Sequence, residues 1–223
     1  MNYKDLMQEL KSFGTEQTRK TLKRHGVQDE LYGVSYAHLG ALKKKIKVDC
    51  ELAQQLWKSG VHDARILATM IADPAQGSSV VDEWVKDVSS YVISDALATF
   101  AAQNSPDPKK IEKWMKSKDE CIGCFGWSLF ARLARTDGPF SDEALEQYLE
   151  TIERDIHQAK NRVKHSMNSA VISIGVRNEK LQKKALAAAA RIGKVEVDHG
   201  DTDCKTPDAA AYIHKTVARA AKK

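Results

Sequence analysis

The stretch SYAHLGALKKKIKVDCELAQQLWKSGVHDARILATMIAD, residues 35–73, decides the fold, because it contains three helical patterns in succession. The patterns predict helices over residues 35–46, 50–59 and 62–73, with short breaks between them. Nothing in the stretch alternates convincingly with period two, as a half-buried strand would. We therefore expect short helices that pack side by side.

The remaining chain continues in the same way. Thr15 and Ser141 are plausible N-caps, and the acids that follow Ser141 suit the helix dipole. Thr206 can cap the last helix, with Pro207 in its first turn. The weak extended segment KVEVD, residues 194–198, is expected to be a loop. The further predicted helices span residues 2–12, 15–24, 78–87, 90–103, 108–117, 120–135, 141–157, 160–175, 178–192 and 207–221.

Short helices with short connections favour antiparallel pairs stacked on one another. The pairs recur roughly every 35–40 residues, which lies within the range of HEAT-like repeats. No linker is long or polar enough to divide the chain. We therefore predict an all-α fold, a HEAT-like repeat solenoid of antiparallel helix pairs, as a single domain over residues 1–223.

The composition is that of an ordinary globular protein, with 42% hydrophobic and 29% charged residues among 223. No apolar run is long enough for a membrane span, and the N-terminus lacks the apolar core of a secretory signal. The four cysteines are too few for a disulfide framework in a chain of this size. We expect a reduced, cytoplasmic protein that does not contact membranes and needs no cofactor.

Two motifs resemble metal or redox sites. Cys121 and Cys124 form a CxxC, but no second ligand pair completes a zinc site and no strand precedes it, so we interpret both as helix-packing residues beside Gly123 and Gly126. The loop from Asp198 to Cys204 is dense in possible ligands. Its mixture of hard and soft donors favours a polar connection over a metal site, and its role stays open.

The net charge of +5 permits a polyanionic partner without requiring one. Any single basic cluster is usually a solvated helix face. Several clusters on one concave surface would instead indicate a polyanion-binding protein. The clusters lie at Arg19–Arg24, Lys43–Lys47, Lys160–His165 and Lys180–Lys184.

The stretch SSYVISDALATF, residues 89–100, carries the sharpest candidate site. Its apolar residues make one stripe at helical spacing, and Tyr91 and Asp95 fall one turn apart on the opposite side. The pair is either an exposed tyrosine with a solvated acid or part of a groove. In a groove, the carboxylate could act on a developing cation while the ring holds a sugar or base.

The block YGVSYAHLGALKKKIKVDCELAQQLWKSGVHDARILATMIADP, residues 32–74, resembles the AlkD-like DNA alkylation repair family. Weaker resemblance continues through WVKDVSSYVISDAL and NSAVISIGVRNEKL, so that it covers nearly the whole chain. The resemblance implies a solenoid of HEAT-like repeats whose basic concave face holds duplex DNA. The glycosylases of this family excise positively charged alkylpurines while aromatic rings and a carboxylate contact the deoxyribose.

The resemblance also implies roles for individual residues. The catalytic aspartate of the glycosylases falls on Asp95, and the tryptophan four positions earlier is Tyr91 here. A cationic alkylpurine is already a good leaving group, so a nearby negative charge that stabilises the sugar cation is the main requirement. On this interpretation the pair faces DNA.

The chain departs from the glycosylases at two places. Their arginine in a Trp-x-Arg-Arg pattern matches the stretch ECIGCFGW, where Gly123 and Cys124 stand near the arginine positions. Their second tryptophan matches the stretch MNSAVISIG, residues 167–175, which contains none. The acid is kept while the arginine and one aromatic ring are lost.

Three functions are consistent with this sequence. The first is a DNA-binding repeat protein of the alkylation repair family, on duplex or branched DNA, with weak or absent glycosylase activity. The second is an active alkylpurine DNA glycosylase that uses Asp95 and Tyr91. The third is a protein-binding solenoid. For the first function, the expected phosphate contacts are Lys43, Lys44, Lys45, Arg162 and Lys164.

Overall fold

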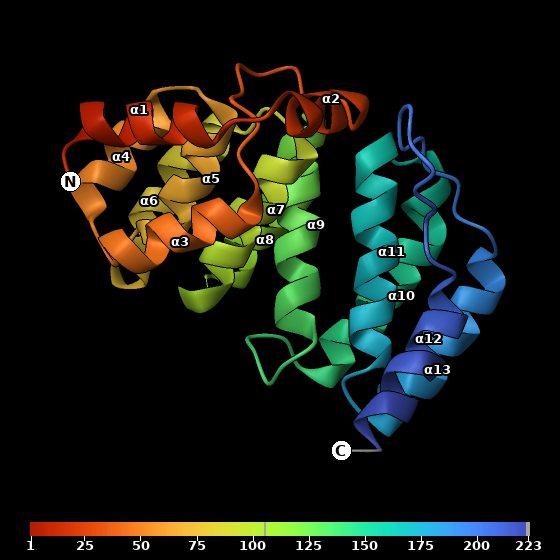
Figure 1. Ribbon diagram of the computed structural model, residues 1–223. Coiled ribbons are helices and arrows are strands. Elements are labelled where there is room, and N and C mark those ends of the chain that lie inside the picture. Colours follow the sequence, from red (N-terminus) through yellow and green to blue (C-terminus); the bar gives the residue numbers. More distant parts are fainter. Residues whose placement is uncertain (105, 222–223) are drawn as a thin grey trace. The chain divides into compact units, whose positions relative to one another are not determined.

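The computed structural model describes residues 1–104 and 106–221 (Figure 1). Helices hold 72% of these residues, about twice the share in an average globular protein, and no strand occurs among them. The prediction of an all-α fold is confirmed. None of the helices in this part of the chain is long and apolar enough to cross a membrane.

The described residues form two compact units. Unit 1 comprises Met1–Asn104 and Gly200–Thr202, and unit 2 comprises the other described residues. A single domain over residues 1–223 stays a prediction beside this division. We describe each unit by itself.

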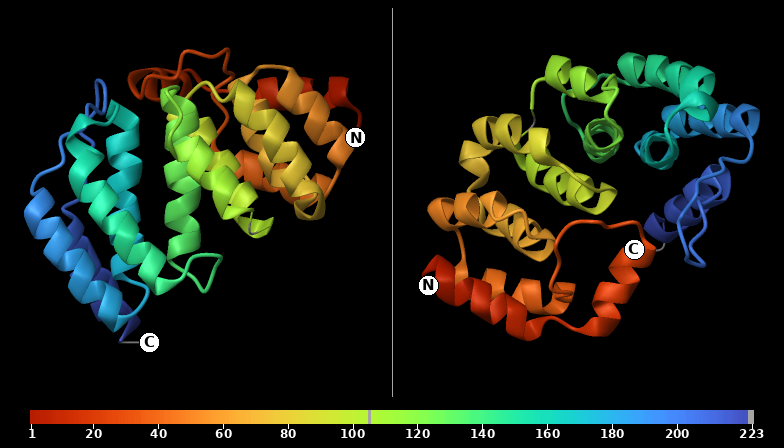
Figure 2. Two further views of the ribbon diagram at one scale, coloured as in Figure 1. Left: turned by 180° about the vertical axis from the view of Figure 1, so that it is seen from behind. Right: turned by 90° about the horizontal axis from the view of Figure 1, so that it is seen from above.

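Unit 1 is built from two rows of helices. In one row α3 packs against α5 and α5 against α7, while α4 and α6 pack behind α5 and α7 (Figures 1 and 2). The α-helices of unit 1 are α1 (Tyr3–Phe13), α2 (Glu16–Arg24), α3 (Tyr36–Ile46), α4 (Cys50–Lys58), α5 (His62–Ile71), α6 (Gly77–Trp84) and α7 (Tyr91–Ala101). Its 3-10 turns are η1 (Pro74–Gln76), η2 (Val85–Asp87) and η3 (Ala102–Asn104).

Unit 2 repeats this arrangement. Its central row runs from α9 through α11 to α13, α8 packs on α9, and α10 packs on α11 and α12. Its helices are α8 (Pro108–Met115), α9 (Glu120–Ala134), α10 (Asp142–Asp155), η4 (Ile156–Gln158), α11 (Asn161–Gly175), α12 (Glu179–Ile192) and α13 (Ala209–Ala220). Each predicted helix therefore has its counterpart, and only the ends differ by a few residues.

The core of unit 1 contains both of its tryptophans and Phe100. The Trp57 and Trp84 rings stack with centroids 4.5 Å apart, and Phe100 packs against Trp84. Both tryptophans are at most 1% exposed. Trp84 donates its indole N–H to Gln54 Oε1 at 3.1 Å, which satisfies its polar atom. The tryptophans of this unit are therefore structural, and none of them is free to stack on a base.

In unit 2 close backbone approach holds α8, α9 and α11 together. A Cβ atom added to Gly126 would lie 2.5 Å from the backbone nitrogen of Met115, so only glycine allows α8 to come this near. Cys124 is buried, with its Sγ 3.2 Å from Ser166 Oγ on α11. The packing interpretation is confirmed for these two residues, while Cys121 is half-buried.

The helix caps agree with the sequence prediction at two positions and differ at a third. Thr15 and Ser141 accept the backbone N–H groups of Thr18 and Ala144 as expected. The prediction for the last helix is wrong, since α13 begins later and its cap is Asp208, which accepts from Ala211 N at 2.8 Å. Thr206 instead contacts His199 Nε2 at 3.0 Å. Residues 194–198 form the expected loop.

Candidate nucleic-acid interface

Helix α7 presents Asp95 away from the core. Ser90 is the N-cap and accepts from Ile93 N, so the helix starts at Tyr91. Ile93, Leu97 and Phe100 are buried, whereas Asp95 is exposed and Tyr91 is half-buried. The expectation that this pair lies off the packing face is therefore met by Asp95 and in part by Tyr91.

Asp95 lines a groove of about 510 Å³ within unit 1. The groove crosses the row α3, α5 and α7, so that Lys43 and Tyr36 of α3 share it with Asp95 of α7. Ile66, Thr69 and Met70 of α5 form its floor. A carboxylate, a phenol and an ammonium group therefore meet at one hollow on the surface of unit 1.

Tyr36 is the residue of this groove that the sequence does not reveal. It is the first residue of α3 and is 59% exposed, an unusual exposure for a large aromatic residue. Burial and then the negative charge of Asp95 raise the pKa of Tyr36, followed by smaller effects of Tyr91 and Asp63. Burial is the larger cause, and Asp95 adds a negative charge to the surroundings of the phenol.

Asp63 holds the segment that leads into α3. Its side chain is 1% exposed, and its two oxygens accept three successive backbone N–H groups. Oδ2 accepts from Tyr32 at 2.6 Å and Gly33 at 3.2 Å, and Oδ1 accepts from Val34 at 2.7 Å. These charge-assisted hydrogen bonds fix the chain two residues before Tyr36. The start of α5 therefore sets the position of the groove's phenol.

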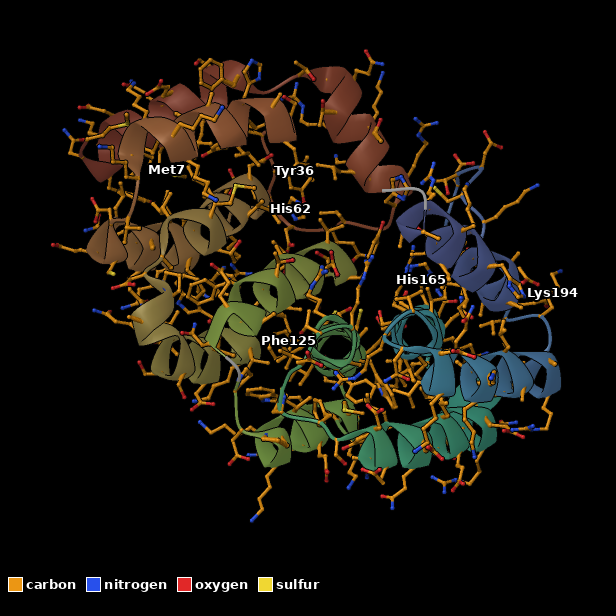
Figure 3. All side chains as sticks on the ribbon, turned by 90° about the horizontal axis from the view of Figure 1, so that it is seen from below. Met7, Tyr36, His62, Phe125, His165 and Lys194 are labelled. Atoms are coloured by element: carbon orange, nitrogen blue, oxygen red, sulfur yellow. The ribbon has the colours of Figure 1, made fainter. Side chains whose placement is uncertain are left out.

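Two residues close to Asp63 in the sequence complete this junction, and Figure 3 labels one of them, His62. His62 is 2% exposed, with its Nδ1 3.7 Å from Asp29 Oδ2, and burial lowers its pKa in spite of that carboxylate. Arg65 donates to the backbone oxygen of Asp87 at 3.0 Å and to Ser89 Oγ at 3.3 Å. The motif HDAR thus ties α5 to the segments that precede α3 and α7. Its residues position the groove and do not line it.

The lysine run on α3 is divided between two faces. Three successive residues are turned by 100° from one another, so they cannot share one side of a helix. Lys43 lines the groove, whereas Lys45 Nζ lies 3.1 Å from both carboxylate oxygens of Glu9 on α1. Lys44 is exposed. The groove therefore receives one of the three lysines proposed as phosphate contacts.

Arg162 and Lys164 lie on α11 in unit 2 and are both half-buried. The Arg162 guanidinium reaches His199 Nδ1 at 3.5 Å, and its backbone N–H donates to Glu120 Oε1 at 2.6 Å. The loop that contains His199 is docked on α11 by a double hydrogen bond, in which Asn161 donates to the carbonyl of Asp198 and accepts from its N–H, each at 2.7 Å. The loop of unassigned role is therefore ordered beside Arg162.

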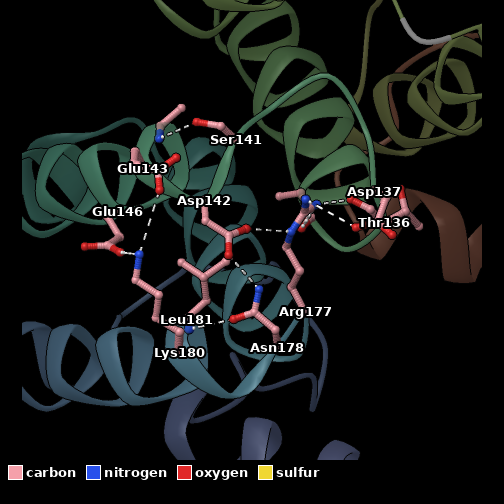
Figure 4. Close-up of polar contacts among 12 residues, drawn as sticks. Thr136, Asp137, Ser141, Asp142, Glu143, Glu146, Arg177, Asn178, Lys180 and Leu181 are labelled. Atoms are coloured by element: carbon pink, nitrogen blue, oxygen red, sulfur yellow. Dashed lines mark hydrogen bonds and ion pairs between the residues drawn. The ribbon is translucent and has the colours of Figure 1, made fainter.

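The basic cluster Lys180–Lys184 is already neutralised by unit 2 itself. Lys180 and Lys184 lie 2.8 Å and 3.2 Å from the two oxygens of Glu146 on α10, and Lys183 pairs with Glu179 at 2.8 Å. Nearby, Arg177 bonds to Asp142 and to the carbonyl of Thr136 (Figure 4). This cluster joins α12 to α10, so it drops out of the candidate interface.

The two departures from the glycosylases also have a structural setting. Gly123 and Cys124 are buried where α9 meets α11, and a Cβ atom at Gly123 would lie 3.2 Å from Val163. In the stretch 167–175, most residues are buried in unit 2, including Met167, Ala170 and Val171. Among the described residues no group of three or more His, Cys, Asp or Glu side chains is arranged to hold a metal ion.

The fold and this groove together define a helical-repeat protein. The family profile described as "DNA alkylation repair enzyme" matches residues 6–213, and the chain therefore belongs to the DNA alkylation repair family. It is 27% identical to the "Uncharacterized protein Lin0241" of Listeria innocua and 26% identical to the "Uncharacterized protein Lmo0209" of Listeria monocytogenes. Each match covers 96% of this chain and 97% of the relative.

A solved structure gives the most detailed comparison. It belongs to a protein described as one of "a new family of proteins related to the HEAT-like repeat DNA glycosylases with affinity for branched DNA structures". The two chains are 31% identical with a TM-score of 0.85, over 99% of this chain and 95% of the other. The prediction of a HEAT-like repeat fold of antiparallel helix pairs is confirmed.

Proposed function

We propose that this protein binds duplex and branched DNA through its phosphates and releases alkylated bases very slowly or not at all. The observation that carries the proposal is the likeness to a family described as having affinity for branched DNA, across nearly the whole chain. The groove of unit 1 supports it, since a phenol and a lysine that line one groove suit a sugar and its phosphate.

The charges of the groove suggest how DNA is held. Asp95 repels phosphates, so cations must supply the affinity. Lys43 in the groove and Lys44 beside it are the cations proposed for unit 1, and Arg162 and Lys164 those for unit 2. Lys45 contributes less, because its charge is shared with Glu9. Contacts of this kind give an affinity that depends on salt and little on base sequence.

The same groove argues against a fast glycosylase. Asp95 lines the groove and Tyr91 lies on the same helix, yet Lys43 lines the groove too, and a positive charge there opposes the build-up of a sugar cation. The residues that stand near the place of the glycosylase arginine, Gly123 and Cys124, lie inside the α9–α11 contact. Misplacement of about 1 Å can cost on the order of 10²-fold in rate, and losing two positioning groups should cost more.

Binding is tested by titrating labelled DNA with the full-length protein at several salt concentrations. We expect binding to a four-way junction and to a duplex, with a steep loss of affinity between low and physiological salt. Lys43→Gln should weaken binding more than the matched change Lys45→Gln, because Lys45 is paired with Glu9. No binding to either DNA at low salt would reject the proposal and favour a protein-binding solenoid.

The second candidate function is an active alkylpurine glycosylase, and the exposed Asp95 beside Tyr36 favours it. Single-turnover release of a methylated base from a defined duplex separates the two. Fast release would establish the second function, whereas release near the uncatalysed rate would support the first.

A further inference from the structure

Helix α2 is an exception among the helices of unit 1, because none of its residues is buried. A helix that is polar on all sides gains little stability from packing. Burial of apolar side chains therefore does not explain why the chain forms a helix here. Leu22 is its most apolar residue and is only half-buried. The sequence EQTRKTLKR therefore encodes an exposed helix and no core face.

The cations of α2 gather on its outer side. Lys20, Lys23 and Arg24 stand at the spacing i, i+3 and i+4, which places them within an arc of about 100°. All three are exposed, and none of their side chains forms an ion pair or a hydrogen bond with another described residue. The surface of α2 thus carries three uncompensated positive charges.

The one acid of α2 is paired elsewhere on the helix. Glu16 Oε2 lies 2.9 Å from Arg19 Nη2, and the pKa of Glu16 is lowered by Arg19 first and by Lys20 and Lys23 only after it. Basic residues in the last turn of a helix complement its dipole, which accounts for Lys23 and Arg24. The dipole does not explain the positive charge of Lys20, which lies outside the last turn. It also does not explain why α2 has no face buried in the core.

The start of α2 is nevertheless held firmly. Thr15 N donates to the carbonyl of Gly33 at 3.0 Å, and Arg19 Nη1 donates to the carbonyl of Tyr32 at 2.9 Å. Gly33 has φ +80, and a Cβ atom there would lie 2.6 Å from the Thr15 carbonyl, so a side chain would force the two segments apart. Through Tyr32 and Gly33, α2 is fixed to the segment that Asp63 holds.

We propose that α2 is a separate binding element for the DNA backbone, with Lys20, Lys23 and Arg24 as its phosphate contacts. The inference rests on the proposed DNA binding and adds to it a surface outside the groove of Asp95. A positioned helix with three free cations attracts a polyanion, and duplex DNA carries one negative charge per about 1.7 Å of its axis. The contact would be independent of base sequence.

The test compares two triple variants of equal charge change. Lys20→Gln with Lys23→Gln and Arg24→Gln removes the free cations of α2, and Lys180→Gln with Lys183→Gln and Lys184→Gln removes paired cations on α12. We expect the α2 variant to lower the slope of log affinity against log salt by up to about 2.7, at about 0.9 for each lost contact. The α12 variant should keep the wild-type slope.

Two further measurements make the result decisive. Both variants should be compared with the wild type by circular dichroism and thermal unfolding. The α2 variant should stay folded with at most a small fall in melting temperature, because nothing buried is changed and only the dipole contribution of Lys23 and Arg24 is lost. Lys20→Arg with Lys23→Arg should retain the wild-type slope, since the charges remain. An unchanged slope in a folded α2 variant overturns the inference alone, whereas a wild type that binds no DNA overturns the proposed function.

Discussion

Asp95 stands beside Lys43 and Tyr36, so its carboxylate affects both DNA binding and any chemistry at a sugar. Asp95→Asn removes a negative charge that would face phosphates. We expect duplex affinity to stay the same or to rise by up to about fivefold, as for an exposed charge worth about 0.2–1 kcal/mol. Any residual release of a methylated base should disappear in the same variant.

The two readouts of this change are independent of each other. Affinity is measured by anisotropy, and release by single-turnover assay on one methylated duplex. Equal release by the wild type and the Asn variant would remove Asp95 from any mechanism, while a loss of affinity would place the carboxylate away from the phosphates.

The hydrogen bonds that the Asp63 carboxylate accepts can be tested by a single substitution. An asparagine there keeps one acceptor oxygen but turns an NH₂ group toward backbone N–H donors that the carboxylate now satisfies. We expect Asp63→Asn to lower the free energy of unfolding by about 3 kcal/mol or more, because hydrogen bonds to a charged group are lost in a buried place. Urea denaturation measures the change.

A matched control lies at the start of the preceding helix. Asp49 also accepts a backbone N–H, from Leu52 at 3.0 Å, but as the N-cap of α4. Asparagine caps a helix about as well as aspartate, so Asp49→Asn should change stability by only a few tenths of a kcal/mol. Equal losses in the two variants would contradict the special role assigned to Asp63.

At the scale of the helix pair, glycine decides how closely α8 and α9 approach. Gly126→Ala would bring a methyl group to 2.5 Å from the backbone of Met115, which cannot move as a side chain tip could. We expect a loss of about 1–3 kcal/mol in stability. Gly40 on α3 has nothing within 4 Å of an added Cβ, so Gly40→Ala should stabilise by about 0.5–1 kcal/mol.

Gly126→Ala is expected to lower the melting temperature and Gly40→Ala to raise it, so thermal unfolding of the two variants tests both expectations. A gain in melting temperature for Gly126→Ala would show that α8 and α9 are separated more widely than described. A loss for Gly40→Ala would show that α3 is packed on that side.

The helices were predictable from sequence because each carries its own periodicity and its own break, as Thr15 and Ser141 illustrate. The contacts between side chains of different helices were not predictable from the sequence. In the sequence, the cluster Lys180–Lys184 looks like a set of unpaired positive charges. Only the structure shows that Lys180 and Lys184 form ion pairs with Glu146 on α10. In the groove, the exposure of Asp95 follows from the pattern of α7, but Tyr36 depends on Asp63, about thirty residues away along the chain.

At the scale of the whole molecule, His62 couples stability to pH. Burial holds its pKa below the unfolded value, although Asp63 and Asp29 oppose this and Arg65 adds to it. The unfolded chain therefore binds a proton more readily, and stability should fall as the pH drops below about 6.5. Above that pH both states are neutral at His62, and this contribution to the pH dependence vanishes.

The check is urea denaturation at pH 7.5 and pH 5.5 for the wild type, His62→Gln and His25→Gln. The difference between the two pH values should shrink in His62→Gln and persist in His25→Gln, a half-buried histidine on the surface of unit 1. The same difference in all three proteins would assign the pH effect to other groups.

The carboxylate of Asp63 also has a consequence for the time scale of motion. Residues 32–34 belong to no helix, and amides in such connections are usually among the least protected from hydrogen exchange. Here each of these three amides donates to a carboxylate that is 1% exposed. They should exchange as slowly as the central turns of α5, so that hydrogen exchange would report this irregular segment as part of the most protected core of unit 1.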